Sequence, residues 1–191
     1  MLEINWPEFF ENGLPLDGKK TSMTVGVFDG VHRGHQTLLE QIVTHNASHV
    51  PVVISFRENY KSNNCGNIQS FRQKLEIFKN IGIKITVAVD FTESFRRIAG
   101  IEFLEILLKR GNIGFFAAGS KFRCGHKLDT GAEDIKNFFA SHNIPVEIVP
   151  EILEGSLPIS SSRIRSCITA GDHHLAQIML GHTHKYDNML Q

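Results

Sequence analysis

The chain has 191 residues, 41% of them hydrophobic, which is enough for one α/β domain and short for two. Its 20 basic and 20 acidic residues balance, so the overall charge gives no attraction to nucleic acid or to a membrane surface. The three cysteines are scattered, and the sequence has no long apolar run and no signal peptide, which favours a cytoplasmic protein. We expect small-molecule partners, and the sequence leaves the oligomeric state open.

Along the chain, short apolar runs alternate with longer segments of helical periodicity, which is typical of a parallel sheet with crossover helices. Residues 1–20 are expected to form an irregular arm and 62–67 a polar loop. The predicted strands are 23–28, 50–56, 84–89, 114–118 and 145–149. The predicted helices are 35–45, 69–80, 101–110, 132–142, 162–170 and 173–180. This order predicts a doubly wound α/β sheet of about five strands, whose ligands bind at the carboxyl ends of the strands.

The most informative segment is TVGVFDGVHRGH at 24–35, which leads from an apolar strand through a glycine turn into a helix. Its glycines let the backbone turn tightly and approach a ligand, and the start of the helix offers unpaired N–H groups to an anion. His32 and His35 are three residues apart and therefore share one face. The segment predicts a nucleotide phosphate site.

Histidines suit one reaction at such a site. When a phosphate oxygen attacks the α-phosphorus of a nucleoside triphosphate, the nucleophile is already an anion and needs no base. The transition state needs relief of charge on its oxygens, which imidazole donors supply. A bare H-x-x-H is more often a cap or a surface pair, but the strand before it and Gly34 between the histidines favour function.

A second motif, ISSSRIR at 159–165, stands just before a predicted helix. Its serines can cap that helix. Capping does not explain Arg163 and Arg165, because the helix dipole disfavours cations in the first turn unless an anion is present. We therefore expect Ser161, Ser162 and Arg165 to bind the β- and γ-phosphates. The alternative is a solvated basic helix start.

These motifs carry a family resemblance. The segment 26–36 resembles the HxGH signature of nucleotidylyltransferases, and its F-D-G-V-H-x-G-H-Q form is similar to the FMN adenylyltransferase domain of bacterial riboflavin kinase/FAD synthetases. The segment 159–165 resembles that family's I-S-S-T-x-I-R motif, 118–125 its G-x-D/N-F-x-F-G loop, and 176–181 its A-x-x-L-L-G segment. The resemblance implies a Rossmann-like domain of the nucleotidylyltransferase type over 21–182, followed by a tail at 183–191.

The implied activity is FMN adenylyltransferase: ATP and FMN give FAD and pyrophosphate, with Mg²⁺ neutralising the triphosphate. The resemblance implies catalytic roles for His32, His35 and Arg165. It implies nucleotide binding by Gly26, Val27, Phe28, Asp29, Gly34, Ser161 and Ser162, although Asp29 has an equal claim as a turn or capping residue. The implied flavin or acceptor loop residues are Phe56, Lys121, Phe122 and Arg123. No protein ligand to a metal is predicted.

The chain also departs from the family pattern. Residues 56–60 read FRENY where the family has F-x-P-H-P, and Lys121 and Cys124 replace an acidic or amide residue and an aromatic one. Because the sequence stops soon after 181, no riboflavin kinase domain is expected. Two alternatives follow: transfer to another small phosphorylated acceptor, or a nucleotide-binding module without turnover. The histidines at 173, 174, 182 and 184 are interpreted as solvated rather than as a metal site.

Overall fold

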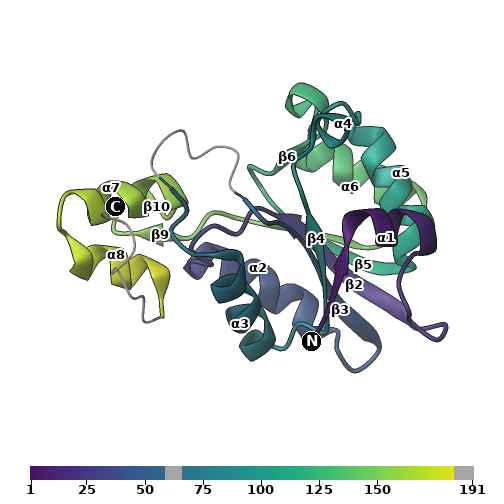
Figure 1. Ribbon diagram of the computed structural model, residues 1–191, viewed down its shortest axis with the longest axis horizontal. Helices are drawn as coiled ribbons and strands as arrows, with labels where there is room; N and C mark the ends of the chain where they lie inside the picture. The colour runs from purple at the N-terminus through teal and green to yellow at the C-terminus, as the bar shows by residue number, and fades with distance from the viewer. Residues whose placement is uncertain (59–65, 183–191) are drawn as a thin grey trace.

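The computed structural model describes residues 1–58 and 66–182, and its centre is a six-stranded parallel sheet (Figure 1). In spatial order the strands are β1 (Leu2–Asn5), β4 (Ile85–Val89), β3 (His49–Phe56), β2 (Lys20–Gly26), β5 (Ile113–Gly119) and β8 (Val146–Val149). From β2 the chain moves through β3 and β4 toward one edge, and from β5 to β8 toward the other. The sheet is therefore doubly wound, as predicted, with its switch point between β2 and β5.

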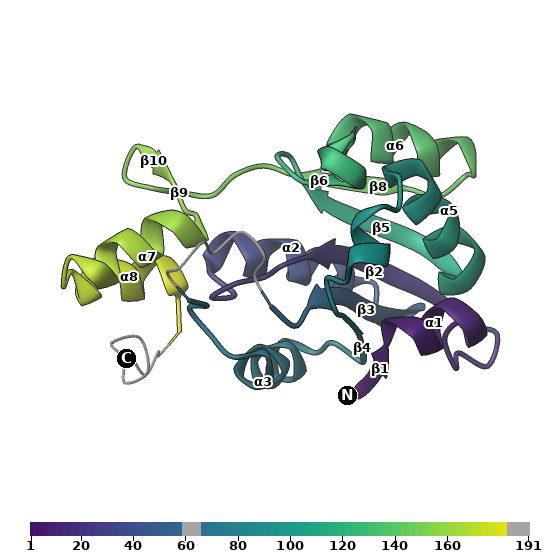
Figure 2. The ribbon, with the colours of Figure 1, turned by 45° about the horizontal axis from the view of Figure 1, so that its top comes forward.

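Helices cover both faces of this sheet (Figure 2). On one face, α2 (Arg33–Thr44) and α3 (Phe71–Ile81) share a core with Val53 and Ala117. On the other, the helices are α1 (Trp6–Asn12), α5 (Gly100–Gly111) and α6 (Ala132–Ser141). Consecutive residues of a strand face opposite sides of the sheet, and here helices cover both sides. Both faces of β3 and β5 are therefore apolar, which explains their continuous hydrophobic runs.

A separate pair of helices, α7 (Ser161–Thr169) and α8 (His173–Leu180), lies beyond the carboxyl ends of the strands in both views (Figures 1 and 2). The pair has its own small core around Ile164 and Met179. The remaining short elements are α4 (Glu93–Arg96), the 3₁₀ turn η1 (His126–Leu128), and two hairpins: β6 (Arg123–Cys124) with β7 (Thr130–Gly131), and β9 (Leu153–Glu154) with β10 (Leu157–Pro158).

The expectation of an irregular arm at 1–20 is wrong, because this segment contains β1 and α1. Strand β1 pairs in parallel with β4 and buries Ile4, and α1 buries Phe9 in the main core. This strand also raises the count from about five to six. An edge strand of four residues and a helix of seven are too short to show periodicity, and tertiary contacts stabilise them.

Two expectations fall at least partly outside the described residues: the tail at 183–191, and most of the polar loop at 62–67. Within residues 1–58 and 66–182, no helix combines the length and the apolar character needed to cross a bilayer.

Candidate active site

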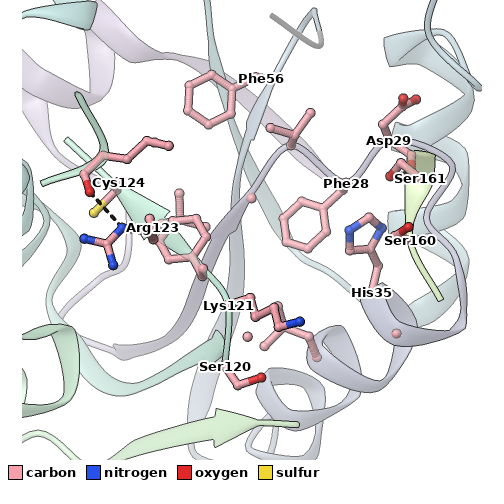
Figure 3. A pocket seen from close by; sticks show the side chains of 18 of the residues that line it. Phe28, Asp29, His35, Phe56, Ser120, Lys121, Arg123, Cys124, Ser160 and Ser161 are labelled. Atoms are coloured by element: carbon pink, nitrogen blue, oxygen red, sulfur yellow. Dashed lines mark hydrogen bonds between the residues drawn. The ribbon is translucent and has the colours of Figure 1, made fainter. Parts of the chain in front are cut away.

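A cavity of about 700 Å³ opens at the carboxyl ends of the central strands, at the switch point. It brings together residues that are far apart in the sequence, and Figure 3 shows several of them around it. Every site residue predicted from the sequence lines this cavity: Gly26, Val27, Phe28, Asp29, His32, Gly34, His35, Phe56, Lys121, Phe122, Arg123, Ser161, Ser162 and Arg165.

The two histidines form a stacked pair at the start of α2. Their ring centroids are 3.6 Å apart and the rings are nearly parallel. His32 is the N-cap of the helix, and its Nδ1 accepts a hydrogen bond of 3.3 Å from the backbone N–H of His35. Because Nδ1 is the acceptor, the neutral His32 ring carries its proton on Nε2. A neutral His32 is therefore a hydrogen-bond donor at Nε2.

Burial keeps both rings uncharged. It lowers the pKa of His32 from 6.5 to about 4. Burial also lowers the pKa of His35 well below 6.5, with smaller contributions from the charges of His32 and Lys74 in the same direction. At neutral pH the pair offers N–H groups to a ligand without adding positive charge.

The ring of Phe28 packs against the ring of His35. The two rings meet edge to face with centroids 5.2 Å apart, and Phe28 is fully buried. A Cβ on Gly26 would lie 2.9 Å from the Phe28 ring, so this position requires glycine for space. Gly34 is also tight, because a Cβ there would lie 3.3 Å from the His32 ring. The glycines of the motif therefore fix the positions of aromatic rings.

The backbone between β2 and α2 is strained. Phe28, Gly30 and Val31 have φ values of +52°, +83° and +37°, in the left-handed region that only glycine adopts without cost.

Four side chains donate hydrogen bonds to carbonyls of this loop. Gln36 donates to Val31 and also to Leu180 at the end of α8, both at 2.7 Å. The side chains of the other three residues also donate hydrogen bonds to backbone carbonyls, at 2.8–3.0 Å: Lys74 to Val27, Ser161 to Asp29 and His182 to Gly30.

Asp29 ties this loop to two other segments. Its Oδ1 accepts from the backbone N–H of Ile68 at 2.8 Å, and its Oδ2 accepts from Arg165 at 2.6 Å. The Asp29 side chain is 3% exposed and that of Arg165 12%. The sequence left Asp29 open between nucleotide binding and a turn or capping role, and assigned Arg165 to the phosphates. The structure pairs the two side chains with each other at the cavity wall.

The second motif also has internal partners. Ser160 caps α7 by accepting from the N–H of Arg163 at 3.2 Å. The guanidinium of Arg163 donates to the carbonyls of Glu154, Leu157 and Pro158 in the β9–β10 hairpin. The interpretation of Arg163 as a sign of a bound anion is therefore unnecessary, because hairpin carbonyls compensate its charge.

The far end of the cavity is aromatic. Phe56 makes edge-to-face contacts with Phe91 and Phe95, at 5.6 and 5.7 Å between centroids, and Phe103 and Phe122 also line this end. Sequence reasoning missed Phe91, Phe95 and Phe103. A usable signal existed for the first two, because they are four residues apart and lie within six residues of the end of the predicted strand 84–89.

The loop after β5 adds polar groups to this end. Lys121 pairs with Glu151 at 2.8 Å, and Arg123 donates from Nε to the carbonyl of Leu128 at 2.8 Å. Burial raises the pKa of the Cys124 thiol to about 12. This cysteine is therefore an unreactive wall residue at neutral pH.

The cavity does not supply the oxygen ligands of a resident divalent cation. Among the described residues, no three His, Cys, Asp or Glu side chains gather at a distance suited to a metal. The carboxylates of Asp29 and Glu151 both line the cavity, and each is already engaged by a cation. A divalent cation prefers several oxygen ligands, and these residues do not provide them.

A doubly wound sheet, a stacked histidine pair at the head of a helix and a capped second helix at the same cavity together define an α/β domain of the nucleotidylyltransferase type. The sequence model described as FAD synthetase matches residues 15–163, which is most of the chain. The chain therefore belongs to the FAD synthetase family.

Relatives in this family have modest identity. The chain is 29% identical to a bifunctional riboflavin kinase/FMN adenylyltransferase of Buchnera aphidicola, over 84% of this chain and 54% of that protein. It is 27% identical to an FAD synthetase of Listeria monocytogenes, over 87% and 70%. For the bifunctional protein of Escherichia coli K12 the identity is 25%, over 84% and 54%. The chain spans about half the length of the bifunctional relatives.

Solved structures support the fold. A crystal structure described as a macrolide-efflux protein from Streptococcus pneumoniae superposes with a TM-score of 0.81 at 27% identity, over 95% of this chain and 60% of that one. A pantoate-beta-alanine ligase from Francisella tularensis superposes with a TM-score of 0.61 at 15% identity, over 95% and 78%. The second likeness concerns the fold alone.

Proposed function

We propose that the chain is an FMN adenylyltransferase that transfers AMP from ATP to FMN and releases pyrophosphate. The observation that carries this function is the stacked, uncharged pair of His32 and His35 at the start of α2, inside a cavity whose other end is aromatic. Family membership and the names of the relatives support it.

In this reaction a phosphate oxygen of FMN attacks the α-phosphorus of ATP. The new P–O bond forms as the bond from the α-phosphorus to the bridging oxygen of the β-phosphate breaks, and pyrophosphate leaves. The nucleophile is an anion, so no proton has to move. His32 and His35 would donate N–H groups to the α-phosphate oxygens, whose charge rises in the transition state.

The nucleotide would lie along the strained loop, against Gly26, Val27, Phe28 and Gly34. Ser161, Ser162 and the first turn of α7 would bind the β- and γ-phosphates, with Arg165 beside them. We assign Asp29 a positioning role, because both of its oxygens bind protein groups that fix the loop. Phe56, Phe122 and Arg123 would surround the acceptor.

Magnesium would arrive with the substrate as MgATP, since Mg²⁺ is usually held by phosphates, waters and few protein ligands. We propose that the catalytic domain includes β1 and α1 as well as the predicted 21–182, because both elements join its sheet and core. We place the reaction in the cytoplasm, where the free thiols of Cys124 and Cys167 remain reduced.

The test is a pyrophosphate-release assay of the purified chain with ATP, Mg²⁺ and FMN, followed by chromatography for FAD. We expect FAD to form, and His35→Ala to lower kcat roughly 10²–10³-fold with a smaller effect on ATP affinity. His174→Ala is the matched control, because His174 is exposed on α8 away from the cavity. Nucleotide binding without any FAD would contradict the proposed activity.

A further inference from the structure

Lys121 and Glu151 form an ion pair at the wall of the cavity. The Nζ–Oε2 distance is 2.8 Å, and the Lys121 side chain is 74% exposed. Both residues line the cavity, Lys121 just after β5 and Glu151 just after β8. The Glu151 side chain is 34% exposed, and a pair this accessible to water is weak, because water screens the attraction between the two charges. Either partner can therefore be exchanged for a ligand.

The position of Lys121 is set by the switch point of the sheet. Strands β2 and β5 are parallel neighbours, with Thr24 opposite Ala117, so their carboxyl ends Gly26 and Gly119 lie side by side. Lys121 follows the end of β5, across from the loop that carries the histidines. In Figure 3 its side chain lies between the Arg123 and Cys124 end of the cavity and the end formed by His35 and Ser161.

Three arginines of the cavity wall have fixed partners. Arg165 is held by the buried Asp29, and Arg123 donates to the carbonyl of Leu128. The guanidinium of Arg96 lies 4.9 Å from the centre of the Phe91 ring. Lys121 differs from these three, because its partner is a carboxylate at the surface and its ammonium group is open to solvent.

The chemistry at this junction favours a cation beside the acceptor, in addition to the Mg²⁺ that would arrive with ATP. Two anionic phosphates must approach each other for the transfer, and their repulsion is offset by a positive charge within a few ångströms. His32 and His35 are uncharged and supply hydrogen bonds without that charge. The exposed ammonium group of Lys121, which lies between the two ends of the cavity in Figure 3, meets this need.

We infer that Lys121 is a specificity-determining residue that binds the phosphate of the acceptor, and that Glu151 holds the lysine until the acceptor displaces it. This extends the proposed function, on which it rests, to a named recognition contact. An acceptor that lacks the phosphate would gain nothing from Lys121. Glu151 would compete with the acceptor phosphate and so weaken its binding.

The experiment compares FMN with riboflavin, which share the ring system and ribityl chain and differ in the phosphate. Binding to the full chain is followed by quenching of flavin fluorescence, which needs no turnover. Lys121→Met should weaken FMN binding about 10- to 100-fold, the range for a lost charge-assisted hydrogen bond, and leave riboflavin binding within about threefold. Unchanged riboflavin binding also shows that the variant is folded.

Two further variants sharpen the result. Glu151→Gln should tighten FMN binding a few-fold, and it should have no effect when Lys121→Met is also present. Lys127→Met is the matched control, because Lys127 lines the same cavity from η1. It should leave the ratio of FMN to riboflavin affinity unchanged.

Three results would overturn the inference: equal loss of both flavins in Lys121→Met, unchanged FMN binding in that variant, or an unmodified chain with no preference for FMN over riboflavin. Formation of FAD by the unmodified chain is measured separately. Phosphate recognition by Lys121 and adenylyl transfer therefore succeed or fail on different readouts.

Discussion

His32 combines two functions in one imidazole, since Nδ1 caps α2 and Nε2 remains for a ligand. Burial behind the loop makes the charged form costly and so keeps the ring a neutral donor. The same burial couples the protonation of His32 to the stability of the fold.

The sign of that coupling follows from the lowered pKa. Between pH 6.5 and about 4 the unfolded chain binds a proton at His32 that the folded chain does not, so stability falls as the pH drops through this window. The loss should reach about 3 kcal/mol for this residue, and His35 acts in the same direction. Urea unfolding at pH 7 and 4.5 measures it.

His32→Asn provides the comparison, because asparagine can cap α2 without titrating in this range. It should lose less stability on acidification than the unmodified chain. Parallel pH dependences of the two proteins would contradict the assignment.

The Asp29–Arg165 pair gives a second prediction for single residues. Asp29→Asn leaves a largely buried guanidinium without its carboxylate, which should lower the free energy of unfolding by about 3 kcal/mol. Adding Arg165→Met should recover part of that loss, because it removes the uncompensated charge. Glu93→Gln is the control, since its pair with Arg97 is exposed and should contribute less than about 0.5 kcal/mol. Equal effects of Asp29→Asn and Glu93→Gln would contradict this reading.

At the scale of elements, α3 supports the site through one buried lysine. Lys74 is 3% exposed, and its ammonium group donates to the carbonyls of Val27 and Phe56, at the ends of β2 and β3. Burial lowers its pKa to about 8, although the nearby charge of Asp29 opposes that shift. Helix α3 is thus linked directly to the strained loop.

Lys74→Met should lower stability by about 2 kcal/mol, because it removes a charged donor from two carbonyls that are out of solvent. Turnover should fall further than stability alone explains, since Val27 leads into the loop that positions the histidines. Lys79→Met, on the exposed side of the same helix, should change neither. Urea unfolding and steady-state kinetics of both variants test this, and a Lys74→Met protein with normal stability and turnover would disprove it.

Sequence patterns located the long elements well. The helices predicted at 35–45, 101–110 and 173–180 correspond to α2, α5 and α8 within two residues at each end. Each has an apolar face long enough to show its period. Strand β1 and helix α1 were missed, because one buried residue in each carries no period and the pairing with β4 is a long-range contact.

For the whole molecule, the N-terminal elements help to build the aromatic end of the cavity. Trp6 of α1 contacts Phe95 edge to face at 5.1 Å and stacks on Phe103 at 5.6 Å, and both phenylalanines line the cavity. The first residues of the chain therefore affect a site whose motifs begin at residue 24.

Trp6→Ala should lower the free energy of unfolding by about 2–3 kcal/mol, less than a fully buried aromatic, because Trp6 is half-buried. It should also weaken flavin binding, since Phe95 and Phe103 lose their support. Phe10→Ala, on the exposed side of α1, should do neither. Urea unfolding and flavin fluorescence measure both effects, and identical behaviour of the two variants would contradict the packing role.

The sequence by itself determined the doubly wound architecture, the long helices and the two phosphate motifs, because strand and helix periods, glycine turns and caps are local properties of the chain. The family resemblance added the acceptor-loop residues. Only the tertiary structure decided which residues pair with each other. In the structure, Arg165 pairs with Asp29 and Lys121 pairs with Glu151. Arg163 donates to a carbonyl of the β9–β10 hairpin, and Lys74 donates to the carbonyl of Val27. Charge pairing and burial depend on residues up to 136 positions apart, and no local pattern encodes such distances.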